Sequence, residues 1–78
     1  MDDLDRISSN PDVMAGKATI RGLRITVAQV VNMVANGMSV EEILVEYPFL
    51  EAEDVRQALR YVAALANEEI HALPMVAS

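Results

Sequence analysis

Apolar residues recur at helical spacing in three segments of the chain. In the first, residues 27–36, valines lie three and four positions apart, and Asn36-Gly37 follows with a glycine suited to end a helix. The second segment begins after Ser39, which forms a capping box with Glu42, and it stops at Pro48. These signals predict one helix over 27–36 and a second, short helix between Ser39 and Pro48.

A third helix is predicted to follow and to run to about Glu69. Glu51, Glu53 and Asp54 precede or open it, where the positive end of the helix dipole favours acids. Its apolar stripe consists of Val55, Leu59, Val62 and Ala66, widened by Ala58 and Leu65. The side chains predicted to face outward are those of Arg56, Gln57, Arg60 and Ala64.

The region before these helices alternates between apolar and polar residues, as a half-buried strand does. With Arg21-Gly22 as a two-residue turn, Ile20 pairs with Leu23 and Ala18 with Ile25, which predicts a β hairpin. Ser9-Asn10-Pro11-Asp12 is a cluster of turn formers that separates this hairpin from a short apolar start.

The order of these elements predicts a mainly α fold with an N-terminal β arm. A short helix, a break containing a proline and a longer helix form a helix-turn-helix candidate. We expect a β-hairpin arm over residues 1–26, a three-helix domain over 27–70 and an apolar C-terminal tail over 71–78.

Composition restricts the choice of fold and assembly. The chain has 78 residues, 53% of them hydrophobic, and no cysteine, so it forms one domain with a thin core and neither disulfides nor thiolate metal sites. Shared burial is the remaining source of stability, so we expect a homodimer. The acidic start and the polar interruptions in residues 25–35 predict neither a signal peptide nor a membrane span, and hence a cytoplasmic protein.

Charge is unevenly distributed along this acidic chain, whose formal net charge is −6. Residues 14–26 contain Lys17, Arg21 and Arg24 and no acid, so three of the six basic residues lie in one short window. The segregation predicts a basic surface on an acidic body. Alternatively, these bases pair with acids of the same fold or of a partner subunit.

A series of short motifs extends from about Arg6 to Ala64. It comprises Gly16-Lys17, Ile20-Arg21-Gly22, Arg24-Ile25 with Val27, Gly37, Glu41-Glu42-Ile43-Leu44, Tyr47-Pro48 with Leu50, Asp54-Val55, Ala58-Leu59 and Tyr61. The series resembles the small prokaryotic family named domain of unknown function 433 (DUF433), some members of which are described as VapB-type antitoxins. The block from Gly16 to Ile25 is its most specific part.

The resemblance implies a homeodomain-like helix-turn-helix protein and a dimeric antitoxin. Genes of the family often neighbour a predicted PIN-like nuclease, so the implied partners are this ribonuclease toxin and, as a second role, operator DNA. The sequence departs from the family pattern at Ala18, commonly proline, and at Leu23, commonly threonine. Glu51 replaces the usual Ser or Thr cap of the third helix and puts an acid where a DNA phosphate would approach.

Two groups of residues are candidates for contact with a partner. Arg56, Gln57 and Arg60 on the third helix have the residue types that read guanine and adenine. The alternative is that Arg56 pairs with Glu53 and Arg60 lies along the surface.

The second group, Lys17, Arg21 and Arg24, could grip phosphates or mask the acidic active site of a nuclease. Its alternative is internal pairing of Arg21 and Arg24 with Asp5, Asp12 or Glu41.

Catalysis and cofactor binding find little support in the sequence. His71 has no nucleophile beside it, and Glu42 with Glu46 is more typical of a solvated acidic face than of a cation site. We therefore expect no enzyme activity, no catalytic residue, no metal and no cofactor. The apolar tail is predicted either to order on the toxin, or to fold back onto the third helix or across a dimer. The expected function is that of an antitoxin-like binding protein; the alternative is a structural or protein-interaction dimer that does not bind DNA.

Overall fold

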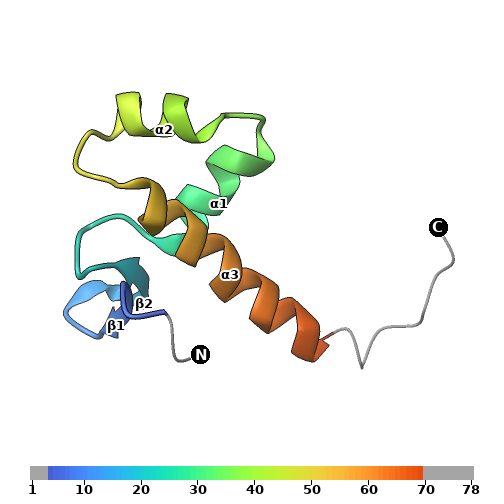
Figure 1. Ribbon diagram of the computed structural model, residues 1–78. Coiled ribbons are helices and arrows are strands. Elements are labelled where there is room, and N and C mark those ends of the chain that lie inside the picture. The colour runs from blue at the N-terminus through green and yellow to red at the C-terminus, as the bar shows by residue number, and fades with distance from the viewer. Residues whose placement is uncertain (1–3, 70–78) are drawn as a thin grey trace, which may run out of the picture.

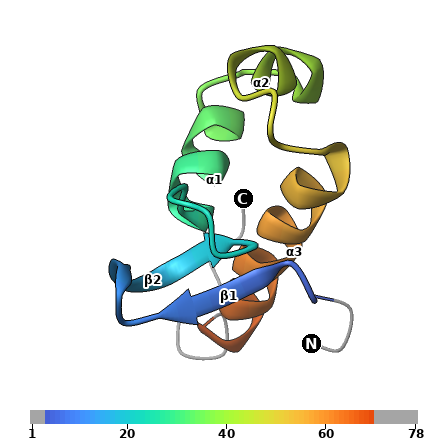
Figure 2. The ribbon, with the colours of Figure 1, turned by 90° about the vertical axis from the view of Figure 1, so that its left-hand side faces the viewer.

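The computed structural model describes residues 4–69, in which a two-stranded hairpin is followed by three helices (Figure 1). The elements in chain order are β1 (Ile7–Asn10), β2 (Val13–Ile20), α1 (Val27–Ala35), α2 (Val40–Glu46) and α3 (Ala52–Glu69). The hairpin lies at one end of the molecule and α2 at the other, and α3 extends from near α2 past the hairpin (Figures 1 and 2). The predicted mainly helical fold with an N-terminal hairpin is confirmed.

Side chains at the helix starts satisfy backbone groups that a helix leaves unpaired. The predicted capping box of α2 is present: the Glu42 N–H donates to Ser39 Oγ at 3.1 Å, and the Ser39 N–H donates to Glu42 Oε1 at 2.8 Å. A second capping box, which we did not predict, opens α1, where Thr26 and Gln29 exchange the same two hydrogen bonds at 3.0 and 2.8 Å. Local hydrogen bonds therefore determine where both helices begin.

The hairpin has a different pairing from the predicted one. β1 and β2 are antiparallel, with Ile7 opposite Ile20 and Ser9 opposite Ala18, and the turn between them contains Pro11-Asp12. The turn of the hairpin therefore lies within Ser9-Asn10-Pro11-Asp12. These turn formers had been interpreted as a separator in front of the hairpin. The turn is stabilised by the Asp12 N–H, which donates to Asn10 Oδ1 at 2.8 Å.

The turn predicted at Arg21-Gly22 does form, although the strand pairing beyond it is wrong. Both central residues have positive φ angles, of 50° and 71°, and the Leu23 N–H donates to the Ile20 carbonyl at 2.8 Å. Ile20 then pairs with Ile25 rather than Leu23, and Thr19 bridges Thr26. Within residues 4–69 no second strand follows the turn, and the segment after it pairs with β2 through this isolated bridge, two residues later than expected. Thr26 also caps α1.

The core forms where the end of β2 meets the three helices. Its buried hydrophobic members are Ile20, Ile25, Val27, Val30, Ile43, Leu50, Val55 and Ala58. The predicted apolar stripe of α3 is therefore only partly in the core. Leu59 and Leu65 belong to that stripe but remain 36% and 42% exposed, so α3 presents apolar surface from its middle toward its C-terminal half.

Candidate functional site

One buried carboxylate joins the arm to the start of α3. The Asp54 side chain has no exposed surface and accepts hydrogen bonds from Arg6 Nη1 at 3.0 Å and from Arg21 Nη2 at 2.8 Å. Arg21 Nε and the Glu51 N–H also donate to it, at 3.1 and 2.8 Å. We call these four residues the Asp54 cluster. Arg6 directly precedes β1 and Arg21 directly follows β2, so the cluster fixes the open end of the hairpin against α3.

The electrostatics of the cluster favour the ionised carboxylate. Burial alone would raise the pKa of Asp54, but hydrogen bonds from Arg21, the Glu51 backbone and Arg6 outweigh it, so the pKa lies below its ordinary value. Arg21 also donates from Nη2 to the Phe49 carbonyl at 2.8 Å. Its guanidinium is therefore engaged within the fold, as the alternative of internal pairing predicted, although the partner is Asp54 rather than Asp5, Asp12 or Glu41.

Gln57, predicted to face outward as a DNA-reading residue, is instead 2% exposed. Its amide donates to Asp5 Oδ1 and to Glu53 Oε2, both at 2.9 Å, and its carbonyl accepts the Arg6 N–H at 2.9 Å. The prediction is wrong because the N-terminal arm covers this face of α3. Helical periodicity predicted that the face of α3 containing Gln57 is exposed to solvent. Periodicity within one helix cannot show whether another segment of the chain packs on that face.

The two arginines of α3 lie on its exposed surface. Arg56 Nε donates to Glu53 Oε1 at 2.8 Å, and Arg56 Nη2 donates to the other oxygen of the same carboxylate. This pair confirms the alternative interpretation of Arg56. The hydrogen bonds from Arg56, followed by that from Gln57, lower the pKa of Glu53 from 4.5 to about 2. Arg60 is exposed one turn further along the helix.

Acidification should destabilise the fold through these two carboxyl groups. The folded pKa values of Glu53 and Asp54 lie below the ordinary ones, so their contribution is complete above the unfolded pKa and is lost as the pH falls through the folded pKa. We expect the free energy of unfolding, measured in urea by circular dichroism, to fall between pH 4.5 and about 2. The Glu53→Gln variant should fall less over this range, and an equal fall in both proteins would contradict the role of Glu53.

Lys17 and Arg24 differ from these engaged arginines. Lys17 lies on β2 and Arg24 in the connection to α1, and both are exposed. Within residues 4–67, neither pairs with a carboxylate. Arg24 therefore does not make the predicted alternative pair with Asp5, Asp12 or Glu41. Of the three basic residues predicted on the arm, these two are exposed and remain available to meet an acidic surface. We call Lys17 and Arg24 the cationic pair for brevity, without implying that they contact each other.

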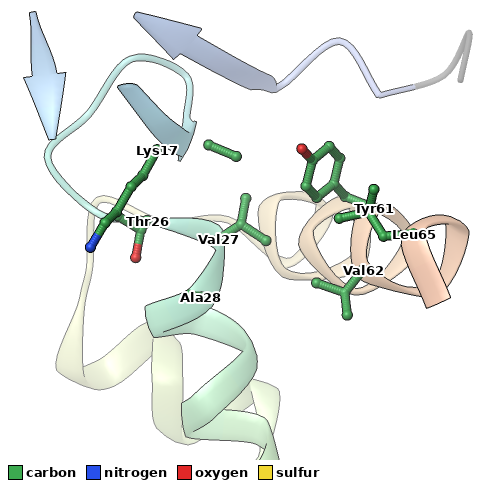
Figure 3. A pocket seen from close by; sticks show the side chains of 8 residues that line it. Lys17, Thr26, Val27, Ala28, Tyr61, Val62 and Leu65 are labelled. Atoms are coloured by element: carbon green, nitrogen blue, oxygen red, sulfur yellow. The ribbon is translucent and has the colours of Figure 1, made fainter. Parts of the chain in front are cut away.

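An apolar groove lies beside Lys17, between β2, the start of α1 and the second half of α3 (Figure 3). It has a volume of about 300 Å³. The residues that line it are Lys17, Ala18, Thr26, Val27, Ala28, Tyr61, Val62 and Leu65. Lys17 and Thr26 lie at one end, and the α3 side chains lie at the other (Figure 3). The sequence placed Val62 and Leu65 in one stripe, but it did not indicate that Ala18 and Ala28 lie opposite them.

The described residues contain no assembled metal centre and no membrane-spanning helix. No group of three or more His, Asp or Glu side chains in that part of the chain could hold a metal ion, and Glu42 and Glu46 are both exposed on α2. None of the helices there is long and apolar enough to cross a bilayer. His71 and the predicted tail lie outside the described residues.

Fold and surface together define a small, mainly helical protein that presents a cationic pair and an apolar groove. The chain belongs to the family described as protein of unknown function DUF433, whose sequence profile matches residues 7–62. The resemblance drawn from the Gly16–Ile25 block and the motifs after it is confirmed at the level of the family.

Two related proteins support this assignment. The uncharacterized protein y4eO of Sinorhizobium fredii (strain NBRC 101917 / NGR234) is 41% identical over 58 residues, which cover 74% of this chain and 26% of that protein. The crystal structure of a DUF433 member from Anabaena variabilis ATCC 29413 has 34% identity and a TM-score of 0.74, covering 82% of this chain and 63% of that one. The chain thus spans about a quarter of the length of the first relative and under two thirds of the second.

Proposed function

We propose that this chain is a non-enzymatic, antitoxin-like binding protein that acts in the cytoplasm and binds a PIN-like nuclease toxin. The observation that carries the proposal is the exposed cationic pair, Lys17 and Arg24, which no described carboxylate neutralises. A nuclease active site built of metal-binding carboxylates is an acidic surface, so the pair supplies complementary charge. Homodimerisation remains part of the proposal.

Several contacts favour a protein partner over DNA bound through α3. Gln57 is covered by the arm, and Arg56 is paired with Glu53. Glu51 is exposed beside the first turn of this helix, where it would repel phosphates. Operator binding by a homeodomain-like helix-turn-helix therefore has less support here than binding of a protein. The alternative to the antitoxin function is that of a structural or protein-interaction module that does not contact DNA.

The direct test is co-expression of the chain with the protein encoded by the adjacent gene. We expect the two proteins to co-purify and the nuclease activity of the partner to be inhibited in the complex. An electrophoretic mobility assay with DNA from upstream of the gene tests the second role, operator binding. The assay is repeated at several salt concentrations, because binding through several phosphates weakens steeply as salt rises. A neighbour that neither co-purifies nor loses nuclease activity would contradict the antitoxin proposal, whatever the result with DNA.

A further inference from the structure

The apolar groove is open within the described part of the molecule, although most of its lining is apolar. Leu65 remains 42% exposed at one side, and Ala28 is exposed on the first turn of α1 at another. Lys17 is the only charged residue in the lining. Exposing such a surface to water is unfavourable, and a chain with a thin core gains stability from any segment that covers it.

We propose that the C-terminal segment of the same chain, residues 70–77, docks in this groove. The segment reads Ile70-His71-Ala72-Leu73-Pro74-Met75-Val76-Ala77 and contains no Asp, Glu, Lys or Arg, whereas charged residues form 23% of the chain. Its composition matches the apolar lining, and Pro74 has no N–H to leave unpaired against an apolar wall. This inference does not depend on the proposed function.

The segment starts close enough to the groove to reach it. It follows α3, which ends at Glu69, and three residues of the groove, Tyr61, Val62 and Leu65, lie on the last turns of the same helix. At about 1.5 Å of rise per residue, Leu65 is roughly 6 Å and Tyr61 roughly 12 Å back along the axis from Glu69. An extended chain spans up to about 3.3–3.6 Å per residue, so Leu73 and Met75 can turn back and reach the groove.

The covalent connection favours the chain's own segment over a second copy. A short tether holds its end at an effective concentration in the millimolar range, far above the micromolar concentration of a dilute protein sample. A second molecule would have to bind without that advantage. We therefore assign the groove to the segment of the same molecule, and the experiment below distinguishes this from occupancy by a second copy.

A spin label at the end of the segment tests the proposal. The chain has no cysteine, so Ser78→Cys provides a single attachment site for a nitroxide outside the apolar residues. We expect the amide NMR signals of Ala18, Val27 and Ala28 to lose most of their intensity, because these groove residues are remote from the label in sequence. The signal of Val45 on α2, at the opposite end of the molecule from the hairpin, should keep its intensity (Figures 1 and 2).

Two matched variants separate docking from mere tethering. Leu73→Ser with Met75→Ser keeps the length of the tether but removes apolar contacts, and Ala28→Glu puts a charge on the groove wall where the start of α1 tolerates an acid. In both labelled variants the groove signals should recover. Equal losses in the variants and in the parent protein would overturn the proposal, because proximity through the tether alone would then explain them.

A mixed sample identifies which molecule supplies the segment. Labelled protein without ¹⁵N is added to ¹⁵N-labelled protein without the nitroxide, so that only intermolecular contacts reduce the signals. We expect no loss in this mixture. Because the sample in which every molecule carries both labels reports contacts of both kinds, loss at the groove in the mixture as well would overturn docking within one molecule and assign the groove to a second copy. No loss in either sample would overturn docking altogether.

Discussion

Replacing Asp54 by alanine should lower the free energy of unfolding by about 3–5 kcal/mol, the usual cost of removing one partner from a buried ion pair. The carboxylate has no exposed surface and holds Arg6, Arg21 and the Glu51 N–H together. Without it, Arg21 loses its carboxylate partner, and Arg6 keeps only the exposed carboxylate of Glu51. The hairpin would lose the contact through which the residues flanking both of its strands, Arg6 and Arg21, are held to α3.

Urea denaturation followed by circular dichroism measures this effect, and Glu51→Gln is the matched control. The Glu51 side chain is 62% exposed and also pairs with Arg6, at 2.6 Å, but exposed ion pairs contribute only about 0–1 kcal/mol. Amide hydrogen exchange adds a local readout: the Arg6 and Arg21 N–H groups should exchange faster in Asp54→Ala. Equal destabilisation by the two substitutions would mean that the burial of Asp54 has no special importance.

The elements that the sequence predicted correctly are those determined by neighbouring residues. Ser39 and Glu42 lie three positions apart, and their capping box is readable without knowledge of the rest of the fold. Thr26 and Gln29 have the same spacing, but Thr26 followed directly on the expected hairpin, and its role as a cap was missed. Both capping boxes could be read from the local sequence. The one at Thr26 was missed because residues up to 26 had been assigned to the β arm.

The contacts that were missed join residues far apart in the chain. Arg6 and Asp54 are separated by 48 positions, and Asp5 and Gln57 by 52. No periodic pattern reports such pairs, because each residue alone has the appearance of a solvated polar side chain. Gln57 shows the consequence: the helix was predicted correctly, whereas the environment of its polar face depended on where the arm packs. The groove was missed for the same reason, since three elements contribute to it.

Neutralising the cationic pair should abolish most of the binding to an acidic protein partner while leaving the fold intact. Lys17 and Arg24 are exposed and, among the described residues, pair with no carboxylate, so Lys17→Gln with Arg24→Gln removes no internal ion pair. If each contact with a carboxylate of the toxin contributes about 1.5 kcal/mol, the double variant should bind roughly 100-fold more weakly. The melting temperature of the free protein should stay close to that of the parent.

The control for this binding experiment must change the net charge equally without touching the pair. Asn32→Asp with Asn36→Asp does so on exposed positions toward the other end of α1, and both double variants lower the net charge by two. Calorimetric titration of each variant with the co-purified nuclease then separates local contact from general repulsion. Comparable weakening in both variants would show that the toxin responds to total charge, and the assignment of its binding surface to Lys17 and Arg24 would be wrong.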